Sequence, residues 1–398
     1  MLINVGYKFM SLLLENKRNR LVAVRWSFFL LIFLFLLSSG LLAQETLKKS
    51  EGQQIIISQE SEPDRLGVTV LPVVYYTPET KMAFGLGSLL TYRFGLLFKQ
   101  ARPSTLFIGA IYTQMKQFTL QLKPELYLQK DSLLLTGNFL AERFPTKLWG
   151  VGPDTEEVLE EVYTPQRFLL EVGLQKKFFW KIPLYLGLKY HLESTRIVET
   201  EPGKLLDQDL VTGSNGGLLS GPGMVLSFDN RNNIFYPTAG SYLQANILWN
   251  DHIFGSDFDF LNIQLDLRHY YQVGDNQVLA IQALAETNSG GVPFYKLARL
   301  GGDSLLRGFY QGRFRDMNLL AFQAEYRFPV WKRLGAVVFG AMGSLANRFR
   351  DLSWDGLKYS AGFGLRFKII PKENANLRVD LAFGPGNYGI YLKAGEAF

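Results

Sequence analysis

Three acidic residues are the best placed in this sequence for acid–base chemistry. Asp266, Glu325 and Asp380 each stand on the polar side of a segment whose other side is apolar. Two carboxylates in unlike surroundings can divide the roles of general acid and general base. The same residues also suit a charged lining with no catalytic role. The elements that carry them decide between the two interpretations.

Other reactive constellations are missing from the sequence. There is no cysteine, which excludes disulfides, thiolate nucleophiles and cysteine-based metal sites. The three histidines, His191, His252 and His269, lie too far apart for the i, i+4 spacing of a helical metal site. No GxSxG turn, no Walker loop and no GxGxxG motif between a strand and a helix occurs. We therefore predict no enzyme activity, no catalytic residue, no metal and no cofactor.

Composition excludes two further classes of protein. Apolar residues make up 47% of the 398 residues and aromatic residues 14%, which is too much for a disordered chain. The net charge of +6 is small for this length, and the basic residues are scattered rather than clustered. Nucleic acid is therefore not an expected partner.

The N-terminal region has the pattern of an export signal. Basic residues precede an apolar run at 26–37, and small residues follow it. The run is shorter than the roughly 20 residues of a spanning helix, which favours a cleaved signal peptide over a retained membrane anchor. We predict a signal peptide over 1–43, with cleavage after Ala43, and a polar periplasmic tail over 44–65.

The rest of the chain alternates between apolar and polar residues with a period of two. Clear examples lie at 117–129, 261–268 and 376–383. Such segments are β-strands with two unlike faces. A soluble sheet turns its apolar face to a core, whereas a membrane barrel turns it to lipid and its polar face to the lumen.

Strand number and length favour the membrane barrel. Sixteen strands are predicted, which is an even number, and most exceed the usual length of about 5 to 6 residues in soluble proteins. Short and long connections also alternate, as in outer-membrane barrels. We therefore predict an all-β fold, a 16-stranded antiparallel transmembrane β-barrel over 66–398, with the N-terminus in the periplasm. The predicted strands lie near 68–76, 82–97, 104–114, 117–129, 132–142, 165–178, 182–194, 218–229, 240–251, 257–271, 276–287, 318–330, 334–345, 356–369, 374–384 and 387–397.

One long connection, 288–317, carries a distinctive motif. It reads LGGDSLLRGFYQGRF and contains Gly301, Gly302, Arg307, Gly308 and Phe309. The strand after it reads AFQAEYRFPVW and places Glu325 on its polar face. An earlier turn, at 228–240, reads FDNRNNIFYPTAG.

These three pieces resemble the BamA/TamA superfamily of outer-membrane barrels, also called the bacterial surface antigen family. The resemblance covers roughly 66–398 and implies that the long loop folds into the lumen, with Arg307-Gly308-Phe309 at its tip. It also implies an ion pair between Arg307 and acidic residues of the inner wall, of which Glu325 matches one. The family's usual second acid is replaced here by Ala341, so Asp380 is the expected substitute.

The C-terminus matches this family only in part, and the N-terminal region does not match it. The final aromatic residue, Phe398, resembles the outer-membrane insertion signal, although Glu396 stands where an apolar residue is usual. The family's periplasmic POTRA domains need far more chain than the residues between Ala43 and Leu66 provide. The sequence is thus predicted to be a barrel-only member. The 149–152 segment, WGVG, also looks like a recurring loop of the family.

The resemblance implies a function in membrane protein assembly and transport. The barrel would help protein or lipid-linked cargo insert into or cross the outer membrane, through a seam between 68–76 and 387–397. Its expected partners are outer-membrane lipids, a periplasmic protein or lipoprotein, and unfolded protein cargo. A structural surface barrel without cargo and a small-solute pore are the alternatives. The plugging loop argues against the pore.

Overall fold

The computed structural model describes residues 66–92, 104–129, 131–179, 182–234, 236–370 and 375–398. The predicted signal peptide (1–43) and periplasmic tail (44–65) lie outside these residues, as does the end of the strand predicted at 82–97. The description below therefore concerns the unit that spans Pro63–Phe398 in its described part.

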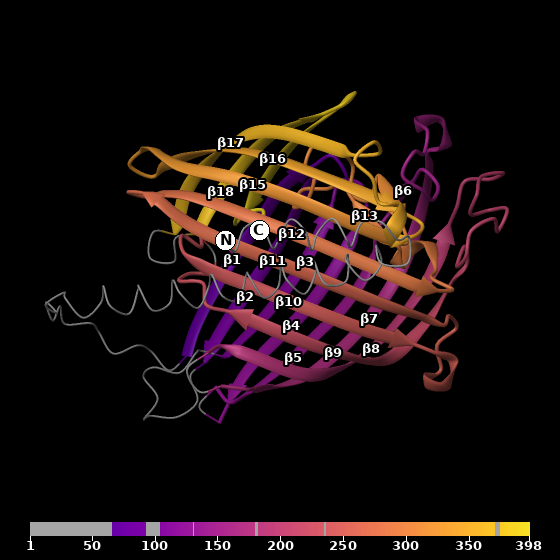
Figure 1. Ribbon diagram of the computed structural model, residues 1–398, viewed down its shortest axis with the longest axis horizontal. Coiled ribbons are helices and arrows are strands. Elements are labelled where there is room, and N and C mark those ends of the chain that lie inside the picture. The colour runs from indigo at the N-terminus through magenta and orange to yellow at the C-terminus, as the bar shows by residue number, and fades with distance from the viewer. Residues whose placement is uncertain (1–65, 93–103, 130, 180–181, 235, 371–374) are drawn as a thin grey trace, which may run out of the picture. The chain divides into compact units, whose positions relative to one another are not determined.

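Sixteen strands of the described chain form one antiparallel barrel (Figure 1). Each strand pairs with the next one along the chain, and β1 also pairs with β19, which closes the sheet. The fold prediction is confirmed. The barrel strands are β1 (Leu66–Thr77), β2 (Lys81–Tyr92), β3 (Ser104–Thr113), β4 (Phe118–Leu128), β5 (Leu133–Arg143), β7 (Glu161–Lys177), β8 (Leu184–Glu199), β9 (Gly216–Asp229), β10 (Gly240–Asn250), β11 (Phe260–Gly274), β12 (Gln277–Gly290), β15 (Asn318–Trp331), β16 (Leu334–Ala346), β17 (Lys358–Ile370), β18 (Ala375–Gly384) and β19 (Asn387–Ala394).

The remaining elements are short and lie in the connections. Strand β6 (Thr146–Leu148) extends the sheet beside β7, and β13 (Ala298–Leu300) pairs with β14 (Phe314–Asp316) as a separate hairpin. Four single-turn 3₁₀ helices complete the described elements, namely η1 (Glu157–Leu159), η2 (His252–Phe254), η3 (Phe294–Lys296) and η4 (Phe349–Asp351). No helix in the described ranges is long and apolar enough to cross a membrane.

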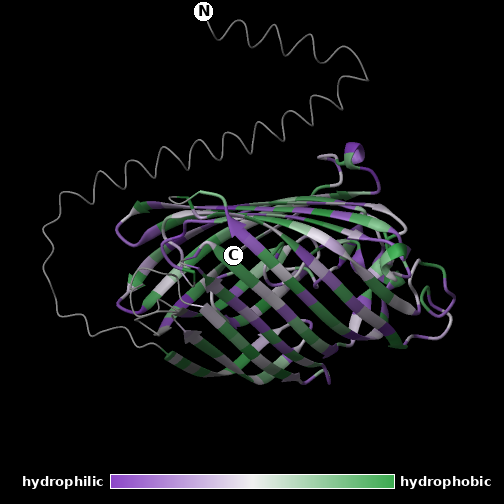
Figure 2. Ribbon diagram, turned by 90° about the horizontal axis from the view of Figure 1, so that it is seen from below, coloured by the Kyte–Doolittle hydropathy of each residue, from purple (hydrophilic) through white to green (hydrophobic). Residues whose placement is uncertain are grey.

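The alternation of the sequence becomes an alternation of faces. On β15, Phe322 points outward and is 42% exposed, whereas Glu325 and Arg327 point inward and are fully buried. Figure 2 shows the same change of hydropathy from residue to residue along the strands. Apolar side chains exposed on the outside and polar side chains inside are the arrangement that lipid requires of a closed barrel.

The two ends of the barrel differ in their connections. One end, here called the loop end, carries the long connections and lies to the right in Figure 1. The opposite end, here called the turn end, carries the connection 230–239 and otherwise mostly shorter connections, together with the start of β1 and the end of β19. The long connections at the loop end are 144–160, 200–215, 251–259, 291–317 and 347–357.

The last strand ends earlier than the sequence predicts. Strand β19 stops at Ala394, and Gly395 adopts a left-handed conformation with φ of 84° that turns the chain inward. Phe398 consequently packs on Tyr270 of β11 and on Val278 and Ala280 of β12. The prediction that 387–397 forms a single strand is wrong.

This inward turn also explains an unusual residue. Glu396 accepts hydrogen bonds from Arg366 at 2.7 Å and from Asn376 at 2.9 Å, on the inner faces of β17 and β18. An apolar residue at this place would leave the Arg366 guanidinium without one of its carboxylates. The acidic residue therefore fits a chain that runs into the barrel and not along its outer surface.

Candidate functional site

The candidate site is built around residues 291–317, here called the inner segment, which connects β12 to β15. Leu300, Leu306 and Phe309 of this segment are buried against inward-facing residues of the wall. These wall residues are Leu319 and Ala321 of β15 and Ala341 and Leu345 of β16. The packing places the middle of the inner segment on the inner face of these two strands.

The glycines of the motif allow the inner segment to bend and to approach the wall. Gly301, Gly302 and Gly308 all have φ between 106° and 117°, a conformation that side chains rarely tolerate. A Cβ atom on Gly301 would lie 2.3 Å from the carbonyl oxygen of Tyr310. On Gly308 it would lie 3.2 Å from the backbone of Phe383 and Gly384 in β18. The tip therefore contacts the wall through bare backbone.

Arg307 lies between two acidic residues of the wall. Its Nη2 donates to Glu325 Oε1 at 2.5 Å, and its Nη1 donates to Asp380 Oδ2 at 2.7 Å. The guanidinium carbon also lies 3.4 Å from the centre of the Phe339 ring. The side chain is 1% exposed, so the attraction acts in a medium from which water is excluded. The structure thus brings together Arg307, Glu325 and Asp380.

This pair of contacts belongs to a larger buried network. Arg327 contacts Glu325 at 2.8 Å, and Arg366 contacts Asp380 at 2.5 Å. Arg378 reaches both Asp380, at 3.3 Å, and Asp303 of the inner segment, at 3.2 Å. Four arginines therefore face four carboxylates, and a buried charge network is stable only when every member keeps its partner. The members are Arg307, Arg327, Arg366 and Arg378 with Asp303, Glu325, Asp380 and Glu396.

The inner segment also contacts both sides of the junction between β1 and β19, here called the seam. On β19, the Tyr391 hydroxyl accepts the Gly308 N–H at 2.9 Å. In the turn after β1, Glu79 Oε1 accepts the Gln311 N–H at 2.8 Å, and burial raises the pKa of this carboxyl. The inner segment therefore bridges the two strands from inside the barrel.

A further ion pair strengthens the contact with β19. Lys393 lies 2.5 Å from Asp303, and its Nζ lies 5.7 Å from the ring centre of Tyr75 on β1. Burial alone raises the pKa of Asp303, but the charges of Lys393 and Arg378 outweigh it and hold the pKa below its ordinary value. Asp303 is thus held ionised between two cations of the wall.

The seam itself has little backbone pairing. Among the described residues, β1 and β19 share one registered pair, Tyr76 with Leu392. By contrast, β1 and β2 share twelve such pairs and β18 and β19 share eight. The side-chain contacts made through the inner segment therefore contribute a larger part of the closure here than at any of these neighbouring junctions.

A second contact zone fixes the inner segment at the loop end. The Trp149 ring lies 5.2 Å from that of Tyr310, and the Gly152 N–H donates to the Arg315 carbonyl at 2.8 Å. Arg313 donates to Thr155 Oγ1 at 2.8 Å and to its carbonyl oxygen at 2.7 Å. The WGVG sequence at 149–152 thus belongs to a loop that packs on the motif-bearing segment.

The acidic residues considered for acid–base chemistry all have cationic neighbours. Asp266 contacts Arg268 at 2.6 Å, apart from the other two. Glu325 and Asp380 lie close together only through Arg307, which bonds to both. Carboxylates neutralised in this way do not form the unlike pair that general acid–base catalysis needs. Their geometry favours a structural lining.

Sequence reasoning missed several members of this site. Arg366 and Arg378 lie on segments with visible alternation, which predicts that they point inward but not which residue they meet. Tyr391 and Lys393 gave no signal beyond their place in the last strand. Asp303 was visible inside the glycine-rich motif, but the sequence did not indicate its contact with Arg378.

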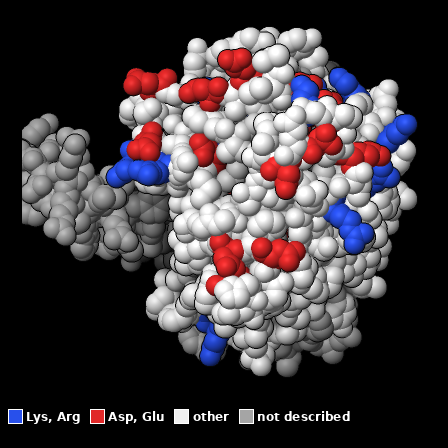
Figure 3. Space-filling view, turned by 90° about the vertical axis from the view of Figure 1, so that its right-hand side faces the viewer, with Lys and Arg blue, Asp and Glu red and all other residues white. Residues whose placement is uncertain are grey.

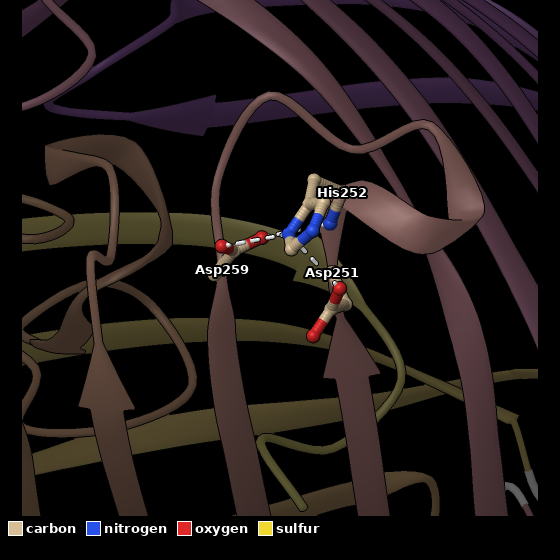
Figure 4. Close-up of side chains that lie close together, drawn as sticks. All are labelled: Asp251, His252 and Asp259. Carbon is tan, nitrogen blue, oxygen red and sulfur yellow. Dashed lines mark hydrogen bonds and ion pairs between the residues drawn. The ribbon is translucent and has the colours of Figure 1, made fainter.

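The loop end carries acidic groups over much of its surface. Figure 3 looks onto this end and shows Asp and Glu side chains spread across it. One small cluster joins Asp251, His252 and Asp259, whose potential ligand atoms lie within 4.8 Å of one another (Figure 4). The Asp259 carboxylate accepts the backbone N–H of His252 at 2.7 Å, and Asp251 caps η2 by accepting the Ile253 N–H. These bonds account for the cluster as the local structure of a loop.

The comparisons with known proteins agree with this architecture. The Omp85 superfamily domain matches residues 109–398. A search of curated protein sequences finds no match. Among solved structures, BamA from Haemophilus ducreyi lacking POTRA domains 1–3 is similar, with a TM-score of 0.58 at 17% identity over 84% of this chain and 70% of that chain.

Two CdiB structures are also similar. CdiB from Acinetobacter baumannii has a TM-score of 0.54 at 10% identity over 83% of this chain, and CdiB from Escherichia coli has 0.54 at 11% identity over 84%. This chain spans only 60% and 64% of their respective lengths, so these likenesses concern the barrel fold. The described residues form a barrel with its connections and contain no POTRA-like domain. With the family model matching most of its length, the chain belongs to the Omp85 superfamily of outer-membrane barrels.

Proposed function

We propose that this barrel assists the insertion of proteins into the outer membrane, or their passage across it, by opening at the seam between β1 and β19. Membership of the Omp85 superfamily supports a barrel of the insertion or translocation class. The observation that carries the seam mechanism is the single registered pair between β1 and β19. The cargo that best fits such an opening is an unfolded β-strand.

Backbone energetics favour opening at this place. Each backbone hydrogen bond contributes about 0.5–1.5 kcal/mol net, so a junction with one registered pair separates more easily than one with twelve. In lipid the freed N–H and C=O groups must find new partners. An incoming strand supplies such partners by adding to the exposed sheet edge.

The inner segment has a proposed role in this process. It bonds to Tyr391 on one side of the seam and to Glu79 on the other, so the seam cannot widen until one of these contacts breaks. The network around Arg307, Glu325 and Asp380 fixes the segment against the wall beside the seam. Movement of the segment and opening of the seam would therefore be coupled.

Orientation and partners complete the proposal. The turn end would face the periplasm and the loop end the outside, following the rule that short turns lie on the periplasmic side. A periplasmic protein or lipoprotein would deliver the cargo. Phe398 would serve as the insertion signal while the chain is unfolded. No enzyme activity and no cofactor are part of this function.

Disulfide trapping tests the seam directly. The described chain has no cysteine, so Tyr76→Cys with Leu392→Cys introduces a single possible bridge between residues that face each other. Oxidation should abolish the delivery of newly made barrel proteins to the outer membrane, and reduction should restore it. The matched control is Ile247→Cys with Ile263→Cys, a registered outward-facing pair between β10 and β11.

The control pair should form its bridge without loss of function, because β10 and β11 stay paired throughout. Full activity of the oxidised seam variant would exclude opening at the seam. If delivery is also unaffected when the protein is absent, a structural barrel without cargo or a small-solute pore is the better hypothesis. Single-channel conductance of the purified protein in planar bilayers separates these two.

A further inference from the structure

The hairpin formed by β13 and β14 has two unlike faces inside the barrel. Ala298 and Leu300 of β13, with Phe314 of β14, belong to the apolar cluster that packs on the inner wall. Side chains alternate between the two faces of a strand. Arg299, which lies between the first two, and Arg315, which follows Phe314, therefore point to the opposite face. This second face is turned away from β15 and β16 and toward the interior of the lumen.

The two arginines of this face lie directly opposite each other. Arg299 and Arg315 form the central registered pair of the hairpin, and the Cβ atoms of such a pair lie about 4.5–5.5 Å apart. A Cβ atom on Gly312 would lie 3.2 Å from Arg299 Cδ and 3.3 Å from Arg315 Nη2, so the two side chains converge at this glycine. Like charges that face each other across two strands destabilise the pairing. The arrangement therefore calls for an anion.

The described residues supply no carboxylate for this pair. Within the described ranges, no acidic oxygen lies within 4.0 Å of a nitrogen of Arg299 or Arg315, and the Arg299 side chain donates no hydrogen bond. The Arg299 side chain is exposed, although the hairpin lies inside the barrel. It is therefore accessible to a small solute in the lumen.

The Arg315 guanidinium is buried, and its hydrogen bonds are long and reach only neutral oxygens. It donates to the Tyr163 hydroxyl at 3.4 Å, to the Lys147 carbonyl at 3.2 Å and to the Gly312 carbonyl at 3.3 Å. Typical N–H···O distances are about 2.7–3.2 Å, so these bonds are weak. Its Nε has no hydrogen-bond partner among the described residues. Arg315 thus keeps a positive charge that no ion pair neutralises.

A third cation adds to the positive potential at this place. Limited contact with bulk water, followed by the charges of Arg315 and of Arg167 on β7, lowers the pKa of Arg299. The charge of Glu286 opposes this shift, but its effect is smaller. The surroundings of Arg299 therefore disfavour a further cation and favour an anion.

The charge of the pair matches phosphate better than a carboxylate. Arginine binds both groups, because its planar guanidinium donates two parallel hydrogen bonds. A carboxylate supplies one negative charge and two oxygens. A phosphate monoester supplies a charge of about −1.5 to −2 at neutral pH and three acceptor oxygens, enough for two guanidinium groups at once.

We propose that Arg299 and Arg315 form an anion site on the lumenal face of this hairpin, and that the site binds a phosphate group, as inorganic phosphate or as the monoester of a small molecule. The phosphate lies between the two guanidinium groups beside Gly312 and joins β13 to β14. The site requires neither cargo nor opening of the seam, so it goes beyond the function proposed above.

Calorimetric titration of the purified full chain tests this site, in a detergent and a buffer that contain no phosphate. The probes are inorganic phosphate, glycerol 1-phosphate and acetate. The wild type should bind inorganic phosphate, and Arg299→Gln should bind it about tenfold more weakly, the loss expected for one charge-assisted contact. The matched control is Arg348→Gln, because Arg348 is an exposed cation in the 347–357 connection. It should leave the binding of phosphate unchanged.

A charge reversal supplies the missing carboxylate. Arg299→Glu should pair with Arg315 across the hairpin and abolish the binding of phosphate. Heat-modified mobility on a gel shows that each variant is folded and gives the temperature at which the barrel unfolds. Phosphate should raise this temperature in the wild type but not in Arg299→Glu.

The outcomes separate the proposal from its alternatives. The proposal is overturned if the folded wild type binds no phosphate, if it binds phosphate no better than Arg299→Gln does, or if Arg299→Gln and Arg348→Gln lose binding equally. Acetate bound as tightly as phosphate overturns the assignment to a phosphate group. Tighter binding of glycerol 1-phosphate than of inorganic phosphate identifies a monoester as the ligand, and the reverse order identifies the free anion.

Discussion

The seam and the part of the wall on which the inner segment packs are closed in different ways. Strands β15 and β16 share thirteen registered pairs, whereas β1 and β19 share one. The first junction is closed mainly by its backbone ladder. The second depends on contacts that the inner segment makes with Tyr391, Lys393 and Glu79. Under the proposed function, a loop distant in sequence from both strands would control how firmly the barrel is closed.

The strongest test of this comparison removes the central cation. Arg307→Ala leaves Glu325 and Asp380 without the guanidinium that joins them, and breaking such a buried pair costs about 3–5 kcal/mol. We expect the inner segment to detach while the barrel still assembles, because strand pairing of the wall is intact. Limited proteolysis of 291–317 in native membranes should become much faster.

The control for this experiment is Arg268→Ala. Arg268 is also an inward-facing arginine with a carboxylate partner, Asp266, but it has no recorded contact with the inner segment. Proteolysis of the segment should be unaffected in this variant. Unchanged protease sensitivity of Arg307→Ala would show that the network does not hold the segment in place.

A smaller effect is expected from Tyr391→Phe. This change removes the hydroxyl that accepts the Gly308 N–H and leaves that donor unsatisfied, which costs about 1–3 kcal/mol. Hydrogen exchange should increase in β1 and β19 but not in β10 and β11. Tyr326→Phe is the control, because its hydroxyl bonds to Gln277 far from the seam. Identical exchange at the seam in both variants would contradict the bridging role of the inner segment.

The smallest effect is expected from acid. The pKa of Asp303 lies below its ordinary value of 3.8, because Lys393 and Arg378 favour its ionised form over the opposing effect of burial. Its contribution to holding the segment is therefore complete above that ordinary value, and it is lost as the pH falls through the lowered pKa. Protease sensitivity of the segment should rise only in this acidic range. Asp303→Asn should show the acid-induced sensitivity already at neutral pH.

The fold was predictable because lipid and lumen impose a strict alternation. The segment 261–268 alternates without interruption, and the observed strand, β11, covers Phe260–Gly274. The resemblance of the motif to the BamA/TamA superfamily likewise implied the contact between Arg307 and Glu325, which the structure contains. Alternation also predicted the inward direction of Asp380.

The other contacts of the site were not predictable, because they join residues of the inner segment to wall residues that are far away in the sequence. Arg378 meets Asp303, and Lys393 meets the same carboxylate, through a bend of the inner segment that residue order alone does not define. The end of β19 was mispredicted for a local reason. The alternation continues through 395–397, and only the left-handed conformation of Gly395 directs the chain away from the sheet.

The inward turn at Gly395 has a consequence for biogenesis. If Phe398 serves as the proposed insertion signal, that signal is accessible to other proteins only while the chain is unfolded, because in the finished barrel Phe398 is 6% exposed and packs against Tyr270 and Val278. Completion of folding would thus hide the element that recruited the assembly machinery. A mature barrel could not compete with its own nascent copies for the same receptor.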